Sequence, residues 1–420
     1  MRMYSLLWLL GCPAAEEKRV EGTEPGDCTD GADNDADSAF DCDDDGCAGA
    51  PDCEGDGGSD SGGGDSGEGG GEDGGDSGDG GGEEGGDGGE PTYDVCADGT
   101  APYADIQEAV DAADDGATLT VCPGTYTDGV TIVDRSVALV APGGPTVTIL
   151  APYERETVVT VRGAGASVGL TGFSLTGGYS GESGGGLVVN EAEVRVEDCV
   201  FSENEGLYGG AIALQDARAT LDGVTLRDNV ATRSGGGLYA YGGSVELLHS
   251  EIDSNSAVDD GGAIYLQDAD AEIHNNLLLH NVIPYNGAAV YAVSGSVLLY
   301  NNLIAWSEPG LSPETSTALI SDDAEVYNNI VYDNDAYGVM CSDGSFLYNL
   351  SYSNSMLNYL SPADSSNLEV DPRFLDAEGG DWTLDEMSAA IDAGNPASAY
   401  NDVDGSRNDM GVFGGPAGSW

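Results

Sequence analysis

Carboxylates alternate with other residues in one short stretch near the start of the chain. Residues 30–43 read Asp-Gly-Ala-Asp-Asn-Asp-Ala-Asp-Ser-Ala-Phe-Asp-Cys-Asp. Asp, Asn and Gly favour turns, and alternate carboxylates in such a loop can all point at one hard cation. Ca²⁺ takes roughly six to eight oxygen ligands, so the stretch is a candidate calcium site. The alternative is a solvated acidic loop held by disulfides.

Three tyrosines recur at a constant step and could bind one ligand together. Tyr239, Tyr265 and Tyr291 are separated by 26 residues each. If the chain repeats a structural unit with that period, the three rings stack as a column on its outer surface. Aromatic rings offer a sugar a flat apolar face, so the column is a candidate carbohydrate-binding site. The alternative is that the rings only pack against one another along a sheet.

Residues for catalysis on polysaccharides do not form a pattern. A lyase that acts on an acidic sugar needs an Arg or Lys base beside an acidic Ca²⁺ site. The repeats contain no Lys, and no two of their arginines are in register: Arg135, Arg155, Arg162, Arg195, Arg218, Arg227 and Arg233. Glycoside hydrolysis needs two facing carboxylates, and an acidic chain supplies such pairs by chance. The carboxylates concerned are Glu197, Asp198, Asp222, Glu246 and Glu272.

The histidines do not make catalysis more plausible. His249, His274 and His280 are expected at surface or turn positions. We identify no catalytic residue and no cofactor-binding residue apart from the candidate calcium ligands. An enzyme would have to use a groove between Arg195 and Arg233.

These residues need a scaffold that repeats, and the chain contains one. A glycine mark followed by small and aliphatic residues returns every 25 or 26 residues, and an asparagine follows each apolar run at the same interval. The marks lie at Gly184, Gly209, Gly235, Gly261 and Gly287, and the asparagines at Asn204, Asn229, Asn255 and Asn281. A fixed period of this length predicts one supersecondary unit stacked on copies of itself.

Each repeat contains two strand patterns. Apolar and polar residues alternate in 196–204 and 221–229, which predicts strands. The second strand of each unit, as in 212–214 and 238–240, should point its first and third side chains inward and its middle one outward. We expect each asparagine to adopt a left-handed bend, because Asn tolerates positive φ, and to form a hydrogen-bonded ladder with its counterparts.

The fold class that follows is all-β, a parallel β-helix. Roughly ten coils fit between residue 117 and about residue 375, and neighbouring strands about 4.8 Å apart would give a length of roughly 50 Å. The aliphatic spacing before each asparagine also fits a leucine-rich repeat. That fold would place a helix or an extended return segment where this chain has glycines and a second β-branched or aromatic run, so the β-helix is preferred.

Both ends of such a solenoid need caps, because each coil is stabilised by its neighbours. Residues 105–108 are typical of a capping box at the start of a helix, and Gly116 ends that helix. One apolar helical face is formed by Ile106, Ala109, Val110 and Ala113. We predict an N-terminal cap helix ahead of the first coil.

A low-complexity linker precedes the β-helix. Residues 54–90 contain only Gly, Ser, Asp and Glu, which cannot form a core, so we predict disorder there. Like charges extend this segment, which suits a tether to a membrane; a filler without a mechanical role is the alternative. The predicted domains are a Cys/Asp-rich module at 13–53, the linker at 54–90, the β-helix with its N-terminal cap at 91–375 and a C-terminal cap at 376–420.

The charge excludes one class of partner. The chain has 12 Lys and Arg against 76 Asp and Glu, a formal net charge of −64. Such a charge repels nucleic acid and anionic lipid, and it disfavours acidic polysaccharides unless cations bridge them. We expect no nucleic-acid binding. No apolar run is long enough for a transmembrane helix.

The first twelve residues are typical of an export signal. Arg2 precedes an apolar stretch at 6–10, and Leu9-Leu10-Gly11-Cys12 resembles the lipobox of bacterial lipoproteins. The resemblance implies that Cys12 is acylated after cleavage, which would place the protein at the outer membrane, surface-exposed or periplasmic. We expect a monomer that reaches the membrane only through this anchor. An ordinary secretory leader is the alternative.

The cysteine count fits an exported protein. If Cys12 carries lipid, eight of the nine cysteines remain, an even number. A bridge between Cys96 and Cys122 would close a loop in the unfolded chain and so stabilise the fold by about 3.5 kcal/mol. Cys199 occupies the same repeat position as Val224 and should be an ordinary buried apolar residue, too many coils from Cys341 to bond with it. The cysteines expected to pair among themselves are Cys28, Cys42, Cys47 and Cys53.

Three stretches carry a family resemblance. Residues 106–126 resemble the opening of right-handed parallel β-helix proteins of the pectin-lyase-like superfamily. The marks at 209–212 and 201–204 are similar to those of chlamydial polymorphic outer-membrane proteins, and 370–374, 390–396 and 402–407 resemble the end cap of secreted bacterial β-helix proteins. The resemblance implies a right-handed coil and a surface location. It does not imply an activity, because this fold serves lyases, hydrolases, esterases and adhesins.

The two acidic clusters also have counterparts. Residues 30–43 are similar to an Asp-rich, Cys-bounded metal-binding motif of myxobacterial surface proteins and to thrombospondin type-3 calcium repeats. The similarity implies Ca²⁺ ligands at Asp33, Asp35, Asp37, Asp41 and Asp43, with Ser38 in place of the usual glycine. Asp402, Asp404 and Asp409 have the same oxygen spacing, but in the β-helix relatives this segment belongs to the cap turn.

Three functions are compatible with the sequence. The preferred one is a surface-anchored, non-catalytic β-helix with an adhesin-like or carbohydrate-binding role. The second is a polysaccharide lyase or glycoside hydrolase that works on an outer face of the coils. The third is a passive envelope spacer without a ligand.

Overall fold

The computed structural model describes residues 92–153, 155–283, 289–309, 317–321, 324–341, 345–359 and 364–418. Residues 88–420 form one compact unit. The predictions for the leader and Cys12, for the Cys/Asp-rich module and for the acidic linker lie outside the described residues. So does the side chain of Cys341.

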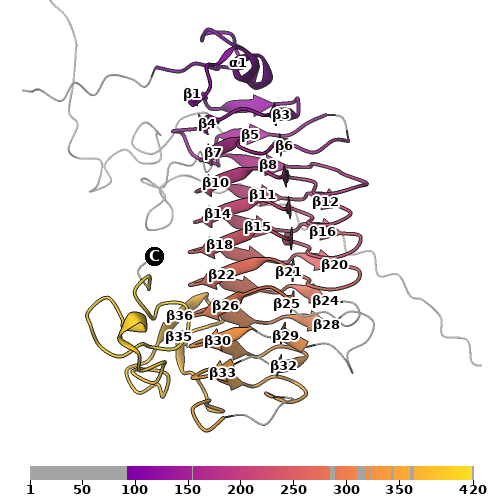
Figure 1. Cartoon of the computed structure of the whole chain (residues 1–420). Coiled ribbons are helices and arrows are strands. Elements are labelled where there is room, and N and C mark those ends of the chain that lie inside the picture. Colours follow the sequence, from indigo (N-terminus) through magenta and orange to yellow (C-terminus); the bar gives the residue numbers. More distant parts are fainter. Residues whose placement is uncertain are drawn as a thin grey trace, which may run out of the picture. The chain divides into compact units, whose positions relative to one another are not determined.

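Parallel sheets run along the stacked coils (Figure 1). The first sheet consists of β1 (Ala117–Thr120), β4 (Val137–Val140), β7 (Ser167–Thr171), β10 (Glu193–Glu197), β14 (Arg218–Asp222), β18 (Ser244–Leu248), β22 (Asp270–His274), β26 (Val297–Tyr300), β30 (Glu325–Tyr327) and β33 (Ser345–Leu347). The second sheet consists of β2 (Gly124–Tyr126), β5 (Thr148–Leu150), β8 (Ser174–Thr176), β11 (Val200–Ser202), β15 (Thr225–Arg227), β19 (Glu251–Asp253), β23 (Leu277–Leu279), β27 (Leu303–Ala305), β31 (Ile330–Tyr332) and β34 (Leu350–Tyr352).

Two further sheets complete the coil. The third sheet consists of β3 (Val130–Val133), β6 (Val159–Arg162), β9 (Leu187–Asn190), β13 (Ile212–Gln215), β17 (Leu238–Tyr241), β21 (Ile264–Gln267), β25 (Val290–Val293), β29 (Thr317–Ser321) and β32 (Tyr337–Cys341). The fourth, short sheet consists of β12 (Glu205–Gly206), β16 (Val230–Ala231), β20 (Ser256–Ala257), β24 (Val282–Ile283) and β28 (Glu308–Pro309). A central coil therefore passes through the first, second, fourth and third sheets in turn, which confirms the parallel β-helix.

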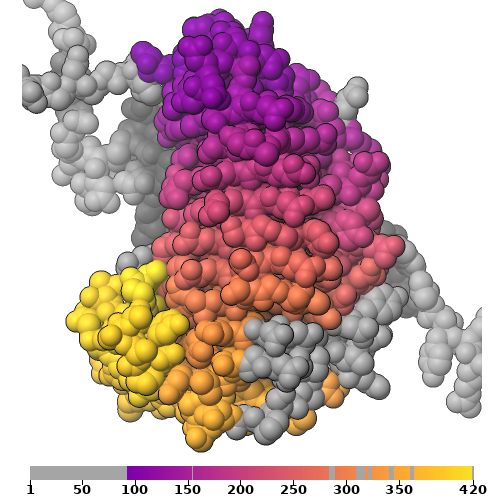
Figure 2. All heavy atoms as spheres, in the orientation of Figure 1, coloured from indigo at the N-terminus to yellow at the C-terminus, as the bar shows by residue number. Residues whose placement is uncertain are grey.

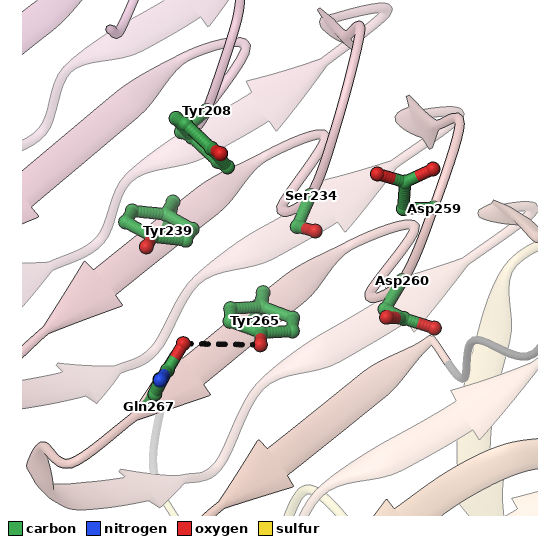
Figure 3. A pocket seen from close by; sticks show the side chains of 7 residues that line it. All are labelled: Tyr208, Ser234, Tyr239, Asp259, Asp260, Tyr265 and Gln267. Carbon is green, nitrogen blue, oxygen red and sulfur yellow. Dashed lines mark hydrogen bonds between the residues drawn. The ribbon is translucent and has the colours of Figure 1, made fainter.

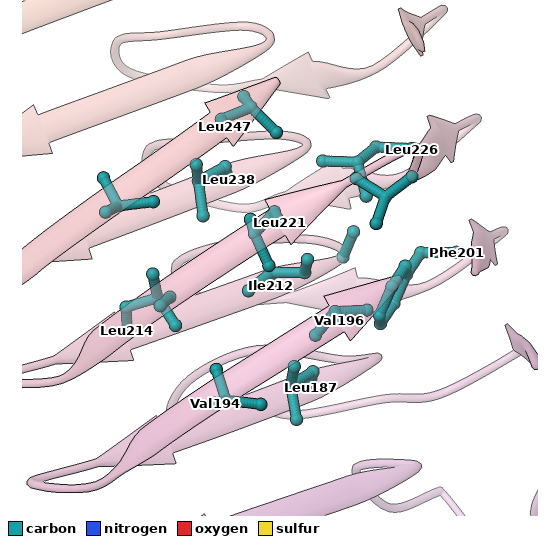
Figure 4. Packing of buried hydrophobic residues seen from close by; sticks show 14 of the residues in the cluster. Leu187, Val194, Val196, Phe201, Ile212, Leu214, Leu221, Leu226, Leu238 and Leu247 are labelled. Carbon is teal, nitrogen blue, oxygen red and sulfur yellow. The ribbon is translucent and has the colours of Figure 1, made fainter. Parts of the chain in front are cut away.

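The tube interior is the main hydrophobic core. Side chains alternate along each strand, and those that point inward stack on their counterparts one coil away, as Leu221 does on Leu247 (Figure 4). In the third sheet, Leu238 and Ala240 are buried while Tyr239 between them is half-buried. The predicted inward and outward positions of this strand are confirmed.

The asparagine ladder forms, but its backbone differs from the prediction. Asn204 donates to Asn229 at 3.0 Å, Asn229 to Asn255 at 2.9 Å and Asn255 to Asn281 at 3.2 Å, all between side-chain amides. The expectation that these asparagines adopt positive φ is wrong. The residue before each asparagine makes the left-handed bend: Glu203, Asp228, Ser254 and His280, with φ between 51° and 56° in these four. That bend turns the following amide into the coil, where it is buried and meets backbone carbonyls.

A second column begins at the free, buried Cys199 and becomes another asparagine ladder. Cys199, Val224 and Ser250 hold the same turn position in successive coils, and Asn276 follows them. Asn276 donates to Asn302 at 3.0 Å and Asn302 to Asn329 at 2.9 Å. Burial raises the pKa of the Cys199 thiol to about 12. Cys199 is thus an unreactive apolar residue, as expected.

The N-terminal end is closed by a helix and a disulfide. Helix α1 (Ile106–Ala112) is capped by Asp105, whose carboxylate accepts from the Glu108 backbone N–H at 2.8 Å. Ile106, Ala109 and Val110 are buried against the first coil. The predicted Cys96–Cys122 bridge is confirmed.

The C-terminal segment packs on the side of the last coils (Figure 2). It contains the hairpin β35 (Phe374–Asp376) and β36 (Asp381–Leu384) and a short 3₁₀ turn, η3 (Ser398–Tyr400). A second apolar cluster lies between this segment and the outer face of the second sheet, made of Leu279, Leu303, Ala305, Ile330, Leu350, Trp382, Ala390, Met410 and Val412. Outward positions of the second sheet are therefore apolar where the segment covers them.

Candidate functional site

The predicted tyrosines form a column on the outer face of the third sheet. Tyr239, Tyr265 and Tyr291 are in direct register on β17, β21 and β25. Each is the middle residue of a strand whose neighbours point inward, so each ring points outward. All three rings are half-buried.

The rings are stacked but offset. The ring centroids of Tyr239 and Tyr265 are 5.4 Å apart with an interplanar angle of 5°, and those of Tyr265 and Tyr291 are 5.7 Å apart at 10°. Offset stacking is the preferred arrangement of aromatic pairs and leaves part of each ring uncovered. The column therefore presents ring surface as well as hydroxyl groups.

A fourth ring, Tyr208, extends the column from a turn. The residue in register with Tyr239 on the preceding coil is Ala213, which has no ring. The Tyr208 ring lies 4.9 Å from that of Tyr239, tilted by 38°. At this end of the column the outermost ring is therefore inclined to the others rather than parallel to them.

Residues from the neighbouring turns form the opposite side of a groove. Tyr208, Ser234, Tyr239, Asp259, Asp260, Tyr265 and Gln267 line a hollow of about 530 Å³ (Figure 3). The Tyr265 hydroxyl lies 3.3 Å from the Gln267 side-chain oxygen. Strands thus supply two of the rings and the Gln267 amide, whereas turns supply the Tyr208 ring, the Ser234 hydroxyl and the two carboxylates.

The glycine marks bring these turns beside the column. Gly235 and Gly261 have φ of 72° and 65°, which glycine adopts without strain. A Cβ on Gly235 would lie 2.4 Å from the Leu238 carbonyl oxygen, and one on Gly261 would lie 2.5 Å from that of Ile264. Only glycine allows this close turn, and the residue just before each mark then faces the groove.

The groove is acidic on one side and neutral on the other. Burial raises the pKa of Asp260, and the neighbouring Asp259 adds to the shift. Burial, with a contribution from Asp260, raises the pKa of Tyr265 to about 12, so its phenol is neutral at physiological pH. Asp259 forms an ion pair with Arg233 at 3.1 Å. The groove can therefore offer hydroxyl donors, ring surface and one carboxylate that is not neutralised by that arginine.

The arginines do not gather into the alternative groove. Arg195 and Arg218 are on the first sheet, Arg227 ends β15 on the second sheet, and Arg233 lies in the turn between β16 and β17. Arg195 is also engaged with Glu197, whose carboxylate accepts from its Nε at 2.7 Å. In the described part of the chain the face between Arg195 and Arg233 is therefore not one basic groove.

The C-terminal acidic residues hold turns together. The Asp402 carboxylate accepts from the backbone N–H groups of Asp409 and Gly415, and the Asp409 carboxylate accepts from that of Asp392 at 2.6 Å. Asp404 accepts from the backbone N–H of Ser406 at 2.9 Å. Within the described ranges no three His, Cys, Asp or Glu side chains are grouped so that they could hold a metal ion.

Two of the histidines lie in turns, and the third lies on a strand. His249 and His280 lie in turns with positive φ. His280 faces Asp253 at 2.8 Å, and His249 contacts Asp222 at 2.9 Å. The expectation of a surface or turn position is wrong for His274, which ends β22, is buried and stacks on Tyr300 at 4.7 Å.

Sequence reasoning missed Tyr208, Ser234, Asp259, Asp260 and Gln267. A signal for three of them was present, because Tyr208, Ser234 and Asp260 each immediately precede a glycine mark. Repeat position alone could have placed them in one line, but not beside the tyrosine column. Among the described residues no helix is long and apolar enough to cross a membrane.

Comparisons with known proteins concern the fold. Residues 186–367 match the family described as a right handed beta helix region, and the groove lies within them. No curated protein matches the chain. A crystal structure of a pectin methylesterase mutant in complex with a hexasaccharide is similar with a TM-score of 0.32 and 9% identity, over 72% of this chain and 100% of that one. The parallel sheets and the family match together show an all-β, right-handed parallel β-helix.

Proposed function

We propose that this protein is a surface-displayed, non-catalytic β-helix that binds carbohydrate along the tyrosine column. The observation that carries the proposal is the stack of Tyr208, Tyr239, Tyr265 and Tyr291 beside the groove. Here we call that groove, with the four rings and Ser234, Asp259, Asp260 and Gln267, the tyrosine groove.

Its chemistry suits a sugar. A pyranose presents an apolar ring face and a rim of hydroxyl groups, which needs aromatic surface and polar groups side by side. The tyrosine groove supplies offset rings, and Ser234 and Gln267 supply neutral hydrogen-bonding groups at its edges. The rings continue over successive coils, so the site suits a chain of sugars better than a single one.

A binding role fits these residues better than catalysis does. The lining residues of the groove include no Lys, Arg or His. Polysaccharide lyases need such a base, and the arginines of the described coils are spread over different faces. The enzyme alternative therefore predicts products, whereas the present proposal predicts retention alone.

The segment ahead of the β-helix would supply the location. We place a lipid on Cys12, an outer-membrane location, a tether at 54–90, and Ca²⁺ on Asp33, Asp35, Asp37, Asp41 and Asp43. The lipobox resemblance and the alternate carboxylates support these assignments. Globomycin-sensitive processing and palmitate labelling of the chain, both lost in Cys12→Ala, would test the anchor.

Retention of the full chain on a glycan array, followed by product analysis on every ligand found, tests the binding proposal. We expect retention without cleavage, and a loss of about tenfold or more in affinity in Tyr239→Ala and in Tyr265→Ala, because each removes stacking surface. Tyr153→Ala is the matched control, since Tyr153 is 88% exposed and is not part of the groove. Absence of any glycan ligand would favour the passive spacer, and released products would favour an enzyme.

A further inference from the structure

One feature of the tyrosine groove is not needed for a neutral sugar. Asp260 is half-buried beside Tyr265, and burial there raises the energetic cost of its charge. An uncharged residue would avoid that cost. The two preceding coils have Tyr208 and Ser234 at the same turn position, so the turn itself does not require a carboxylate.

Asp260 has no cationic partner among the described residues. Its neighbour Asp259 is engaged by Arg233, at 3.1 Å between Nη1 and Oδ2. Within the described part of the chain, the charge that acts on Asp260 is that of Asp259, and it is repulsive. A positively charged ligand would relieve this repulsion and replace the missing partner.

The surroundings of Asp260 are those that bind an ammonium group. Ammonium groups are attracted to the faces of tyrosine rings and form charge-assisted hydrogen bonds with carboxylates. The Tyr239 and Tyr265 rings and the Asp260 carboxylate line the same hollow (Figure 3). A cationic ligand is also drawn to a chain of net charge −64, whereas a polyuronate is repelled.

We propose that the tyrosine groove takes a linear glycan with free amino groups, with one ammonium held by the Asp260 carboxylate against the Tyr239 and Tyr265 rings. This inference rests on the proposed carbohydrate-binding function and names its ligand class. The column over successive coils favours a polymer, because one ammonium would occupy only a small part of it. Neutral sugars of the same polymer lie on the remaining rings.

The test compares two ligands that differ only in the amine. The full chain is titrated calorimetrically, at physiological salt, with a β-1,4-linked glucosamine tetramer and with its fully N-acetylated counterpart. We expect the amine form to bind about tenfold more tightly, as one charge-assisted hydrogen bond allows. Asp260→Asn should remove this preference, so that the variant binds the two tetramers with equal affinity.

The control variant removes a charge elsewhere. Glu246→Gln makes the same change in net charge on the outer face of the first sheet and should keep the preference. A preference that survives in Asp260→Asn reflects the charge of the whole chain and overturns the inference. Equal binding of tetralysine, with the same dependence on Asp260, overturns it in favour of a general cation site.

Two further outcomes separate this inference from the proposal on which it rests. Equal affinity for the two tetramers overturns the amine preference and leaves carbohydrate binding intact. Binding of neither tetramer overturns the amine inference, and only the array result then decides whether the groove binds any glycan.

Discussion

At the scale of single residues, the tyrosine groove depends on side chains that are absent. Gly235 and Gly261 lack the Cβ that would meet a backbone carbonyl oxygen at 2.4 or 2.5 Å, and Ala213 lacks the ring that would fill the place beside Tyr208. Tyr265 can stack on both neighbours because the repeat places Tyr239 and Tyr291 in register with it. Small residues thus determine which large side chains can pack together in the tyrosine groove.

Gly261→Ala tests this dependence. The substitution imposes positive φ on alanine and drives its Cβ against the Ile264 carbonyl oxygen, so we expect a loss of about 2 to 4 kcal/mol in the free energy of unfolding. Ligand binding should weaken because Asp260 moves with the turn. The control is Gly144→Ala, where φ is also positive (79°) but nothing lies within 4 Å of the added Cβ, and where the loss should stay near 1 kcal/mol. Equal losses in chemical denaturation would contradict the argument.

At the scale of elements, the turns contribute more than the strands do to holding successive coils in register. One left-handed residue, such as Ser254, directs the next amide inward, where Asn255 accepts from the Asn229 side chain and donates to the Leu226 carbonyl oxygen at 2.8 Å. The Asn229 and Asn255 amides therefore each join three coils. The strands between the turns are three to five residues long in the first three sheets and could not hold their register alone.

Asn255→Ala should lower the free energy of unfolding far more than the small number of atoms removed suggests. It leaves the Leu226 carbonyl and the Asn229 backbone N–H without their buried partner, and we expect a loss of about 2 to 4 kcal/mol. Asn401→Ala removes an amide whose hydrogen bond is exposed and should cost less than about 1 kcal/mol. Urea denaturation followed by circular dichroism measures both. Similar midpoints for the two variants would contradict the role assigned to the ladder.

The C-terminal turn carries a pH-dependent element. Burial, with the nearby Asp402 adding to it, raises the pKa of Asp409 to about 6. A folded-state pKa above the ordinary value means that the folded form binds the proton more readily, so this group stabilises the fold progressively as pH falls from about 6 toward 4 and destabilises it as pH rises. Because Asp409 is partly exposed, we expect Asp409→Asn to stabilise at pH 7.5 by only about 1 kcal/mol.

The gain in Asp409→Asn should disappear near pH 4, where the native carboxyl is protonated. Thermal midpoints at the two pH values measure it. Asp404→Asn is the control, because Asp404 is exposed and its pKa is lowered by the Ser406 hydroxyl, so no such gain is expected. A stabilisation by Asp409→Asn that is the same at both pH values would contradict the assignment.

The repeat made the coil, the inward strand positions and the tyrosine column predictable from sequence, because residues 26 apart in a regular solenoid come into register. It did not make the bend residues predictable, because both Glu203 and Asn204 can lie in a turn, and packing in the coil interior decides which of the two takes the left-handed conformation. Tyr208 and Asp260 were missed because the path of their turns depends on glycine geometry rather than on period. The side-on packing of Trp382 and Met410 lies beyond the repeat, where no period exists to follow.

At the scale of the whole molecule, electrostatic repulsion opposes folding. A net charge of −64 acts against any compact state, and the described cations that form ion pairs do so mostly at exposed positions. Such repulsion is screened over about 10 Å at 0.1 M salt, less at higher salt. The same charge would keep copies of the chain apart and keep it soluble.

Salt should therefore stabilise this protein. We expect the thermal midpoint to rise when NaCl increases from about 10 mM to about 0.5 M, because screening weakens repulsion between carboxylates. Differential scanning fluorimetry of the full chain measures the rise, and an equal ionic strength of KCl should give the same result. A falling midpoint would mean that attractive ion pairs outweigh the repulsion.

The C-terminal segment also links several coils along their outer side. Asn275 donates to the carbonyl oxygens of Val412 and Gly414, Asn301 donates to those of Asp409 and Gly411, and the Asn328 side-chain oxygen accepts from the Asn395 backbone N–H. These three asparagines lie on successive coils, so the C-terminal segment links coils that could otherwise unfold one at a time. When the C-terminus is pulled, we expect one large unfolding event as this segment detaches from the coils. A regular series of smaller unfolding events should follow as the coils unwind one after another.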